Sequence, residues 1–89
     1  MSDTQNKMMS ALDEEIRVLE HGRLLLATAD AEMLQRAVEV LGSERGAALW
    51  LIGKPRALGR RIPLEVASSS AGADEVRQVL GAYENGGYL

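Results

Sequence analysis

The N-terminal third of the chain carries an amphipathic pattern with the period of a helix. Its apolar residues follow one another in steps of three and four, with charged residues between them, at Met9, Leu12, Ile16 and Leu19. This spacing predicts a helix with one apolar seam of the kind that packs against another helix. The seam continues to Arg23 and Leu26, which is short of the three or four heptads that a coiled coil requires. Two interpretations therefore stay open, packing within the domain and dimerisation.

Two features limit the length expected for this first helix. Residues 1–7 are polar and are expected to fray. Gly22 weakens a helix interior by about 1 kcal/mol relative to alanine, so the dipeptide His21-Gly22 is a candidate break.

Short helical patterns separated by capping residues fill the middle of the chain. The stretch Thr28-Ala29-Asp30 offers N-caps for a second helix, whose apolar stripe is Leu34, Ala37, Val38 and Leu41. Gly42 is placed to end that helix, and Ser43 to cap a third one, which Gly53 and Pro55 end. Each boundary thus has a residue type that favours it.

The last third of the chain predicts two further helices. Pro63 suits the first turn of a short helix, and residues 68–72 form a turn cluster rich in serine. Asp74 and Glu75 are expected in the first turn of a last helix, which Asn85 and the glycines after it end. No segment has the alternation of a strand, so the sequence predicts an all-α fold, a small bundle of four to five helices.

Composition adds limits on the chemistry. The 89 residues fit one small domain, and the absence of phenylalanine leaves a core of aliphatic side chains and methionine. There is no cysteine and only one histidine, His21, so we expect no catalytic residues, no metal site and no cofactor. The N-terminus lacks a signal peptide and no stretch reaches the roughly 18 apolar residues of a membrane span, so a cytoplasmic protein is expected.

One segment departs from the acidic character of the chain. The net charge is −3, yet basic residues gather between positions 54 and 65 at Lys54, Arg56, Arg60 and Arg61. Pro55, Gly59 and Pro63 identify this segment first as a connector between helices, with Leu58 in the core. For its arginines two interpretations stay open, contact with a partner and an intramolecular ion pair.

The order of residues in the second half resembles that of a known family, the antitoxin Xre/MbcA/ParS toxin-binding domain. The resemblance covers roughly residues 31 to 89 and rests on Trp50-Leu51, Pro55, Ala57-Leu58-Gly59, Ile62-Pro63-Leu64, Gly72, Val76, Leu80 and Gly86. Arg60 and Ile62 stand where the family commonly has a second glycine and a threonine. Arg60 thereby places a Cβ at a position expected to need a positive φ.

The resemblance implies an antitoxin that neutralises a RES-domain toxin, an enzyme that consumes or uses NAD+. In such systems the C-terminal segment of the antitoxin lies at the entrance of the NAD-binding cleft. Carried onto this chain, the blocking segment is Asn85, Gly86, Gly87, Tyr88 and Leu89. A tyrosine can fill a site built for an aromatic base, and a free carboxylate can meet an arginine that binds phosphate. The basic loop is the second candidate for contact with the toxin.

Two domains of different role follow from this reading. Residues 1–30 form a tail and an amphipathic helix with a possible dimerisation seam, and residues 31–89 form the toxin-binding domain. The expected partners are a RES-domain toxin and a second antitoxin in a hetero-oligomer. Direct DNA binding is not expected, since only about 30 residues precede the domain. The alternatives are a DNA-associated regulator that uses the basic loop and a dimerisation module without a toxin.

Overall fold

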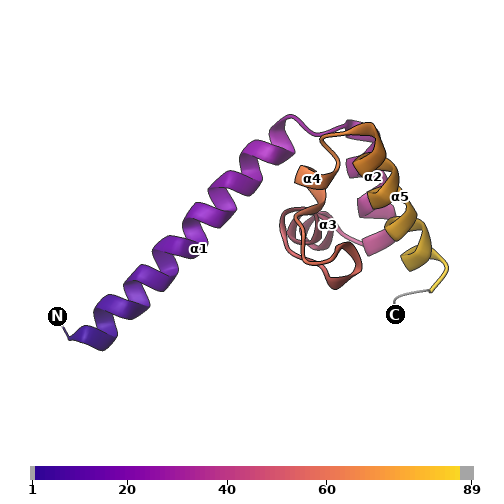
Figure 1. Cartoon of the computed structure of the whole chain (residues 1–89). Helices are drawn as coiled ribbons and strands as arrows, with labels where there is room; N and C mark the ends of the chain where they lie inside the picture. Colours follow the sequence, from indigo (N-terminus) through magenta and orange to yellow (C-terminus); the bar gives the residue numbers. More distant parts are fainter. Residues whose placement is uncertain (1, 87–89) are drawn as a thin grey trace.

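The computed structural model describes residues 2–86, and this part of the chain is helical without any strand (Figure 1). In chain order the elements are α1 (Asp3–Ala27), α2 (Ala31–Leu41), α3 (Glu44–Ile52), a short 3-10 turn η1 (Arg56–Leu58), α4 (Pro63–Val66) and α5 (Ser70–Glu84). The predicted small all-α bundle is confirmed.

Side-chain caps set the beginnings of the four longer helices. In each case an oxygen of the capping residue accepts a hydrogen bond from the backbone N–H three residues later, at 3.0 to 3.1 Å, and the caps are Ser2, Asp30, Ser43 and Ser69. These bonds satisfy donors that the first turn of a helix leaves without an intrahelical partner. The predicted caps Asp30 and Ser43 are confirmed.

The expectation that residues 1–7 fray is wrong for the described residues of that stretch. Ser2 and Gln5 form a reciprocal capping box, in which the Gln5 side chain accepts from the Ser2 backbone N–H at 2.9 Å. A capping box satisfies two donors at once, and α1 therefore begins at Asp3. The prediction of fraying relied on the polar composition of residues 1–7 and overlooked the capping box formed by Ser2 and Gln5.

The last helix begins earlier than the sequence indicated. Ser69 caps α5, so residues 70–72, expected in a turn, form its first turn. Asp74 and Glu75 consequently lie in the second turn and not in the first. Three consecutive serines each have the chemistry of an N-cap, which left the boundary undetermined in the sequence.

α1 runs without a break through His21 and Gly22. Gly22 is buried where α1 crosses α3, and a Cβ placed there would approach Ile52 Cδ1 to 2.7 Å. The glycine is thus needed for close packing of the two helices, and it does not interrupt α1.

The core lies among α2, α3 and α5, with α4 and η1 closing one side (Figure 1). Its most deeply buried side chains include Ala37, Leu51, Leu58, Val76 and Leu80. The predicted burial of Leu58 is confirmed at 1% exposure. Leu58 reaches the core because Pro55 and Gly59 bound a single 3-10 turn that aims it inward.

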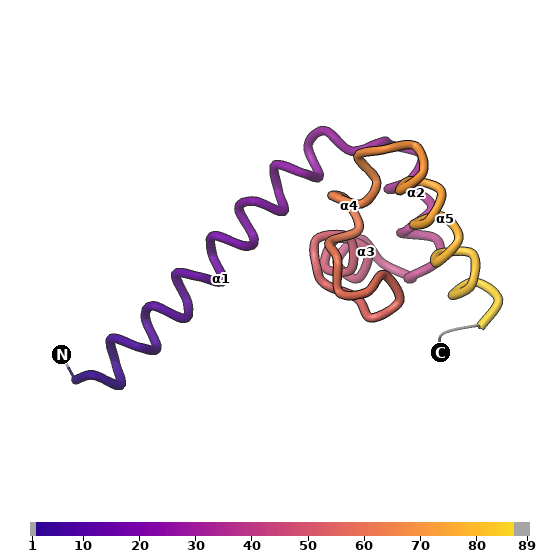
Figure 2. Tube along the Cα trace, viewed as in Figure 1, coloured from indigo at the N-terminus to yellow at the C-terminus, as the bar shows by residue number. Residues whose placement is uncertain are grey.

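α1 contacts this body only through its C-terminal turns, and the rest of the helix extends away from it (Figures 1 and 2). The molecule measures 49 by 28 by 23 Å, and its radius of gyration is 15.1 Å. A compact domain of this length has a radius of gyration of about 12 Å. The difference comes from the projecting helix. Within residues 2–86, none of the helices combines the length and apolar character that a bilayer crossing requires.

Candidate functional site

The end of α5 is one candidate site, because the proposed blocking segment begins there. Asn85 closes the helix by donating its backbone N–H to the Gly81 carbonyl at 3.1 Å, and Gly86 follows with a φ of 78°. Both residues are exposed. The three other residues of the predicted segment, Gly87, Tyr88 and Leu89, lie outside the described residues. This end of the body lies far from the N-terminus of α1 (Figure 2).

Two aromatic side chains fasten the last turn of α5 to α3. Trp50 donates its indole N–H to the Tyr83 hydroxyl at 3.1 Å, and the two rings meet edge to face with centroids 5.7 Å apart. Edge-to-face aromatic pairs stabilise a contact by about 0.5 to 1.5 kcal/mol beyond their buried area. Gly86 follows three residues after Tyr83, so this pair holds the last described turn of the chain against α3.

The sequence did not predict the contact between Trp50 and Tyr83, because the two residues are 33 positions apart. The one feature that could have drawn attention to it is that Trp50 is the single tryptophan of the chain. A second long-range contact supports the same end of the bundle, where Arg36 of α2 pairs with Glu84 at 3.3 Å.

The four basic residues of the connector do not behave as one group. Arg61 donates through Nε to the Leu58 carbonyl at 2.8 Å and also pairs with Glu75 of α5. It therefore joins the connector to α5. Of the two interpretations of the arginines, Arg61 thus follows the one that expected an intramolecular ion pair. Among the described residues, the side chains of Lys54, Arg56 and Arg60 have no ion-pair partner, and all three are exposed.

Arg60 adopts the left-handed conformation that its position was expected to require. Its φ is 61°, directly after Gly59 with a φ of 63°, and its backbone N–H donates to the Pro55 carbonyl at 3.0 Å. A residue with a Cβ rarely occupies this region. Arg60 thus carries an exposed charge at the tip of a tight turn.

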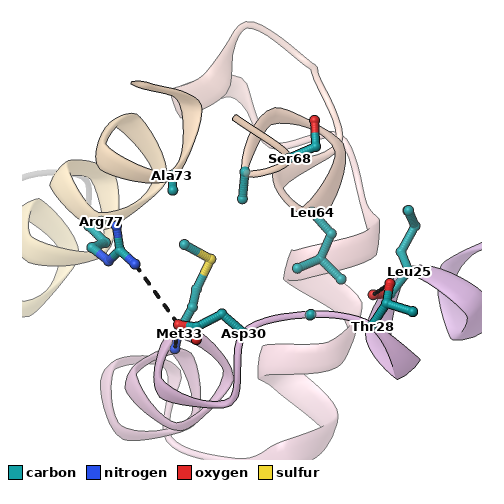
Figure 3. Close-up of a pocket in the computed structure, with 10 residues that line it drawn as sticks. Leu25, Thr28, Asp30, Met33, Leu64, Ser68, Ala73 and Arg77 are labelled. Atoms are coloured by element: carbon teal, nitrogen blue, oxygen red, sulfur yellow. Dashed lines mark hydrogen bonds and ion pairs between the residues drawn. The ribbon is translucent and has the colours of Figure 1, made fainter. Parts of the chain in front are cut away.

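A hollow of about 360 Å³ lies where α2, α4 and α5 meet the end of α1 (Figure 3). Met33 and Leu64 form its apolar floor, and Arg77 reaches across to Asp30, with 3.9 Å between Nη2 and Oδ2. The lining holds no histidine and no pair of groups able to act as nucleophile and base. Its polar groups serve helix capping and an ion pair, so we assign it no chemistry.

Other titratable groups lie on the surface. His21 is exposed, and its Nε2 lies 3.6 Å from Glu65 Oε1 between α1 and α4. Arg17 donates to Glu14 at 2.7 Å, and this hydrogen bond, with the charge of the carboxylate, raises the pKa of Arg17. In the part of the chain that the structure describes, no three acidic or histidine side chains are grouped to hold a metal ion.

The predicted seam of the first helix lies on the projecting part of α1. All four of its side chains are exposed, by 39 to 65%, at Met9, Leu12, Ile16 and Leu19. Packing within the domain, one of the two interpretations of the seam, is therefore wrong for these residues. The sequence could not distinguish the two cases, because both give the same periodicity.

A small helical body with exposed basic side chains and an exposed apolar helix face has the features of a protein-binding module. The family model described as the antitoxin Xre/MbcA/ParS C-terminal toxin-binding domain matches residues 36–86. The chain belongs to this family and has the role of an antitoxin whose partner is a toxin. Comparison with curated proteins and with solved structures gives no match.

Proposed function

We propose that the chain is the cytoplasmic antitoxin of a RES-domain toxin that consumes NAD+. It inhibits by occlusion, with the segment from Asn85 to Leu89 lying across the entrance of the toxin's active site. The chain itself binds and does not catalyse. Two such antitoxins pair through α1, so that the complex contains a homodimer.

The single observation that supports inhibition by occlusion is the way in which α5 ends. The helix stops at an exposed Asn85 and Gly86, while Trp50 and Tyr83 hold its last turn against α3. A helix end that is held firmly against the body suits insertion of the residues after it into a cleft, because this base itself loses little conformational freedom on binding. Tyr88 has a ring of the size that a site for a nicotinamide or adenine base accepts.

The exposed cations of the connector contribute a second contact. Lys54, Arg56 and Arg60 have no acidic partner among the described residues, so binding to an acidic rim of the toxin costs no internal ion pair. Charges of this kind accelerate association more than they add affinity. Arg61 is excluded from this role in the proposal, because it is engaged by Leu58 and Glu75.

Deletion of Gly87 to Leu89 tests the occlusion in cells that co-express the toxin. We expect loss of neutralisation with unchanged helical content, because the helices and the core described above lie within residues 3–84. A matched control replaces the exposed Leu49, which lies on α3, by alanine and should neutralise like the parent chain. Full neutralisation by the truncated chain would refute the role of the segment.

The alternative function, a DNA-associated regulator, rests on all four basic residues of the connector, Lys54, Arg56, Arg60 and Arg61. It predicts an affinity for duplex DNA that falls steeply with salt, with a slope of about −0.9 per phosphate neutralised. A titration of the chain without toxin at low salt decides between the two functions. We expect no binding, given the net charge of −3.

A further inference from the structure

The exposed apolar surface of this molecule is concentrated on one helix. Seven of the eight large hydrophobic side chains that are exposed in residues 2–86 belong to α1, namely Met8, Met9, Leu12, Ile16, Val18, Leu19 and Leu24. The eighth is Leu49. Apolar patches of this extent on a small protein mark an interaction surface.

The seam within this surface points away from the body. Successive residues of a helix are rotated by about 100°, which places the four seam residues roughly 60 to 140° around α1 from Gly22. Gly22 is the point at which α1 is pressed against Ile52 of α3. A helix that lies along the seam therefore occupies space that the body leaves free.

The amount of exposed surface matches what a dimer requires. A compact monomer of 9.6 kDa exposes about 5,100 Å², whereas this chain exposes 6263 Å². The excess of roughly 1,200 Å² exceeds the ~800 Å² that each partner buries in a standard stable interface.

We infer that the occupant of the seam is a second copy of this chain, packed antiparallel along Met9 to Leu19. The inference rests on the homodimer of the proposed function and adds its geometry. The spacing of the seam, in steps of three, four and three, reads the same in both directions. In an antiparallel pair, Met9 of one copy therefore lies opposite Leu19 of the other, and Leu12 lies opposite Ile16. Both pairs are centred on residue 14, where the two-fold axis of the dimer passes.

Charge favours this orientation over the parallel one. A parallel pair stacks Arg23 on Arg23 within the seam and places Glu15 beside Glu20 on both sides. The antiparallel pair sets Arg23 opposite Gln5 instead. It retains only the contacts of Asp13 with Asp13 and of Glu15 with Glu15 at the axis. Because these carboxylates repel, added salt strengthens the dimer.

The antiparallel arrangement also keeps the toxin-binding ends apart. Gly22 of one copy lies alongside residue 6 of the other, so the two sites at which α1 meets its body are about 24 Å apart along the helices. Each body then presents its α5 end independently, and each antitoxin can engage one toxin.

Cysteine pairing measures the orientation directly, because the chain has no cysteine of its own. We propose the single variants Met9→Cys and Leu19→Cys, oxidised separately and as an equal mixture. In the antiparallel dimer only the mixture forms a cross-linked dimer, of mixed mass. Two copies of residue 9 are then about 15 Å apart, beyond the reach of a disulfide. Strong cross-linking of each variant by itself means a parallel dimer and overturns the inference, while the homodimer stands.

A matched pair of substitutions tests the seam itself. Leu12→Gln lies in the seam and Leu24→Gln outside it, with exposures of 65% and 70% in the single chain. By light scattering and sedimentation, Leu12→Gln should weaken the dimer at least tenfold and Leu24→Gln should leave it unchanged. Circular dichroism checks that both variants keep their helical content. A parent chain that stays monomeric at high concentration, or a dimer insensitive to Leu12→Gln, refutes the seam as its interface.

Discussion

Gly22 and Gly72 show how single residues decide the packing of this small body. A Cβ at Gly72 would lie 1.7 Å from the Val66 carbonyl oxygen, so α5 can start against α4 only because no side chain is present. Gly22 allows the same close approach of α1 to α3. The sequence indicated Gly22 as a candidate helix break and Gly72 as part of a turn, since close contact between helices leaves no local signature.

Substitution of Gly22 by alanine tests this packing. The new methyl group meets Ile52 Cδ1 at 2.7 Å and overpacks the junction, while the helix propensity of α1 improves by about 1 kcal/mol. We expect a net loss of about 1 to 2 kcal/mol in the free energy of unfolding, measured by urea denaturation. Gly81→Ala is the control, because the nearest atom, Arg36 Nη2, lies at 3.9 Å. That variant should be more stable by up to about 1 kcal/mol, and equal effects of the two substitutions would contradict the packing account.

Arg60 separates a backbone requirement from a side-chain function. The sequence predicted a positive φ at this residue, and the structure has 61°. Glycine accepts that conformation without strain, which favours the folded state. It also gives the unfolded chain more conformational entropy, which disfavours folding, and the two effects nearly cancel.

Arg60→Gly should therefore change the free energy of unfolding by less than about 1 kcal/mol. The same variant should slow association with the toxin several-fold and reduce its dependence on salt. Surface plasmon resonance at two salt concentrations measures both quantities. Arg45→Ala, an exposed arginine on the first turn of α3, is the control. Unchanged association by Arg60→Gly would remove this arginine from the toxin interface.

Elements were predicted from the sequence better than their boundaries. Ser43 and Gly42 have unambiguous capping chemistry, Asp30 was one of the candidate caps in residues 28–30, and α2 and α3 lie where this chemistry placed them. The start of α5 was ambiguous among three serines, and the start of α1 was concealed in a polar stretch. Periodicity gave the seam of α1 but not its exposure, because exposure depends on the three-dimensional position of the body.

One charged side chain links the connector to α5, in addition to the burial of Leu58 in the core. Arg61 donates to the Leu58 carbonyl and to Glu75, and it thereby links η1, the turn at Arg60 and the last helix. Which arginine would make the ion pair was open in the sequence, because four cations compete within eight residues.

Arg61→Ala should destabilise the fold by about 1 to 2 kcal/mol, since it removes a charge-assisted hydrogen bond and a half-exposed ion pair. Glu75→Gln should cost less, because it leaves the bond to Leu58 intact. A double-mutant cycle by thermal denaturation measures the coupling of the pair, which we expect to be about 0.5 kcal/mol or more. Strictly additive effects would mean that the two side chains do not interact in solution.

At the scale of the whole molecule, the two proposed binding surfaces lie at opposite ends. α1 extends from one side of the body, and α5 ends on the other side (Figure 2). The sequence supplied the order of residues that identified the family, and the family model matches residues 36–86 of the same region. It did not supply the pairing of Trp50 with Tyr83, because contacts between distant residues depend on how the helices cross.

The proposed inhibition by occlusion separates binding from blocking, and one experiment with the proposed partner, a purified RES-domain toxin, measures both. The fluorescence of Trp50, the only tryptophan of this chain, reports on the end of α5 after the toxin's own signal is subtracted, and calorimetry confirms the affinity. In the same samples, the rate of NAD+ consumption is followed with the parent chain and with the chain lacking Gly87 to Leu89. We predict that the parent chain stops NAD+ consumption, whereas the truncated chain still binds the toxin and leaves its rate near that of the free enzyme. Equal inhibition by both chains at saturating concentration would contradict the account.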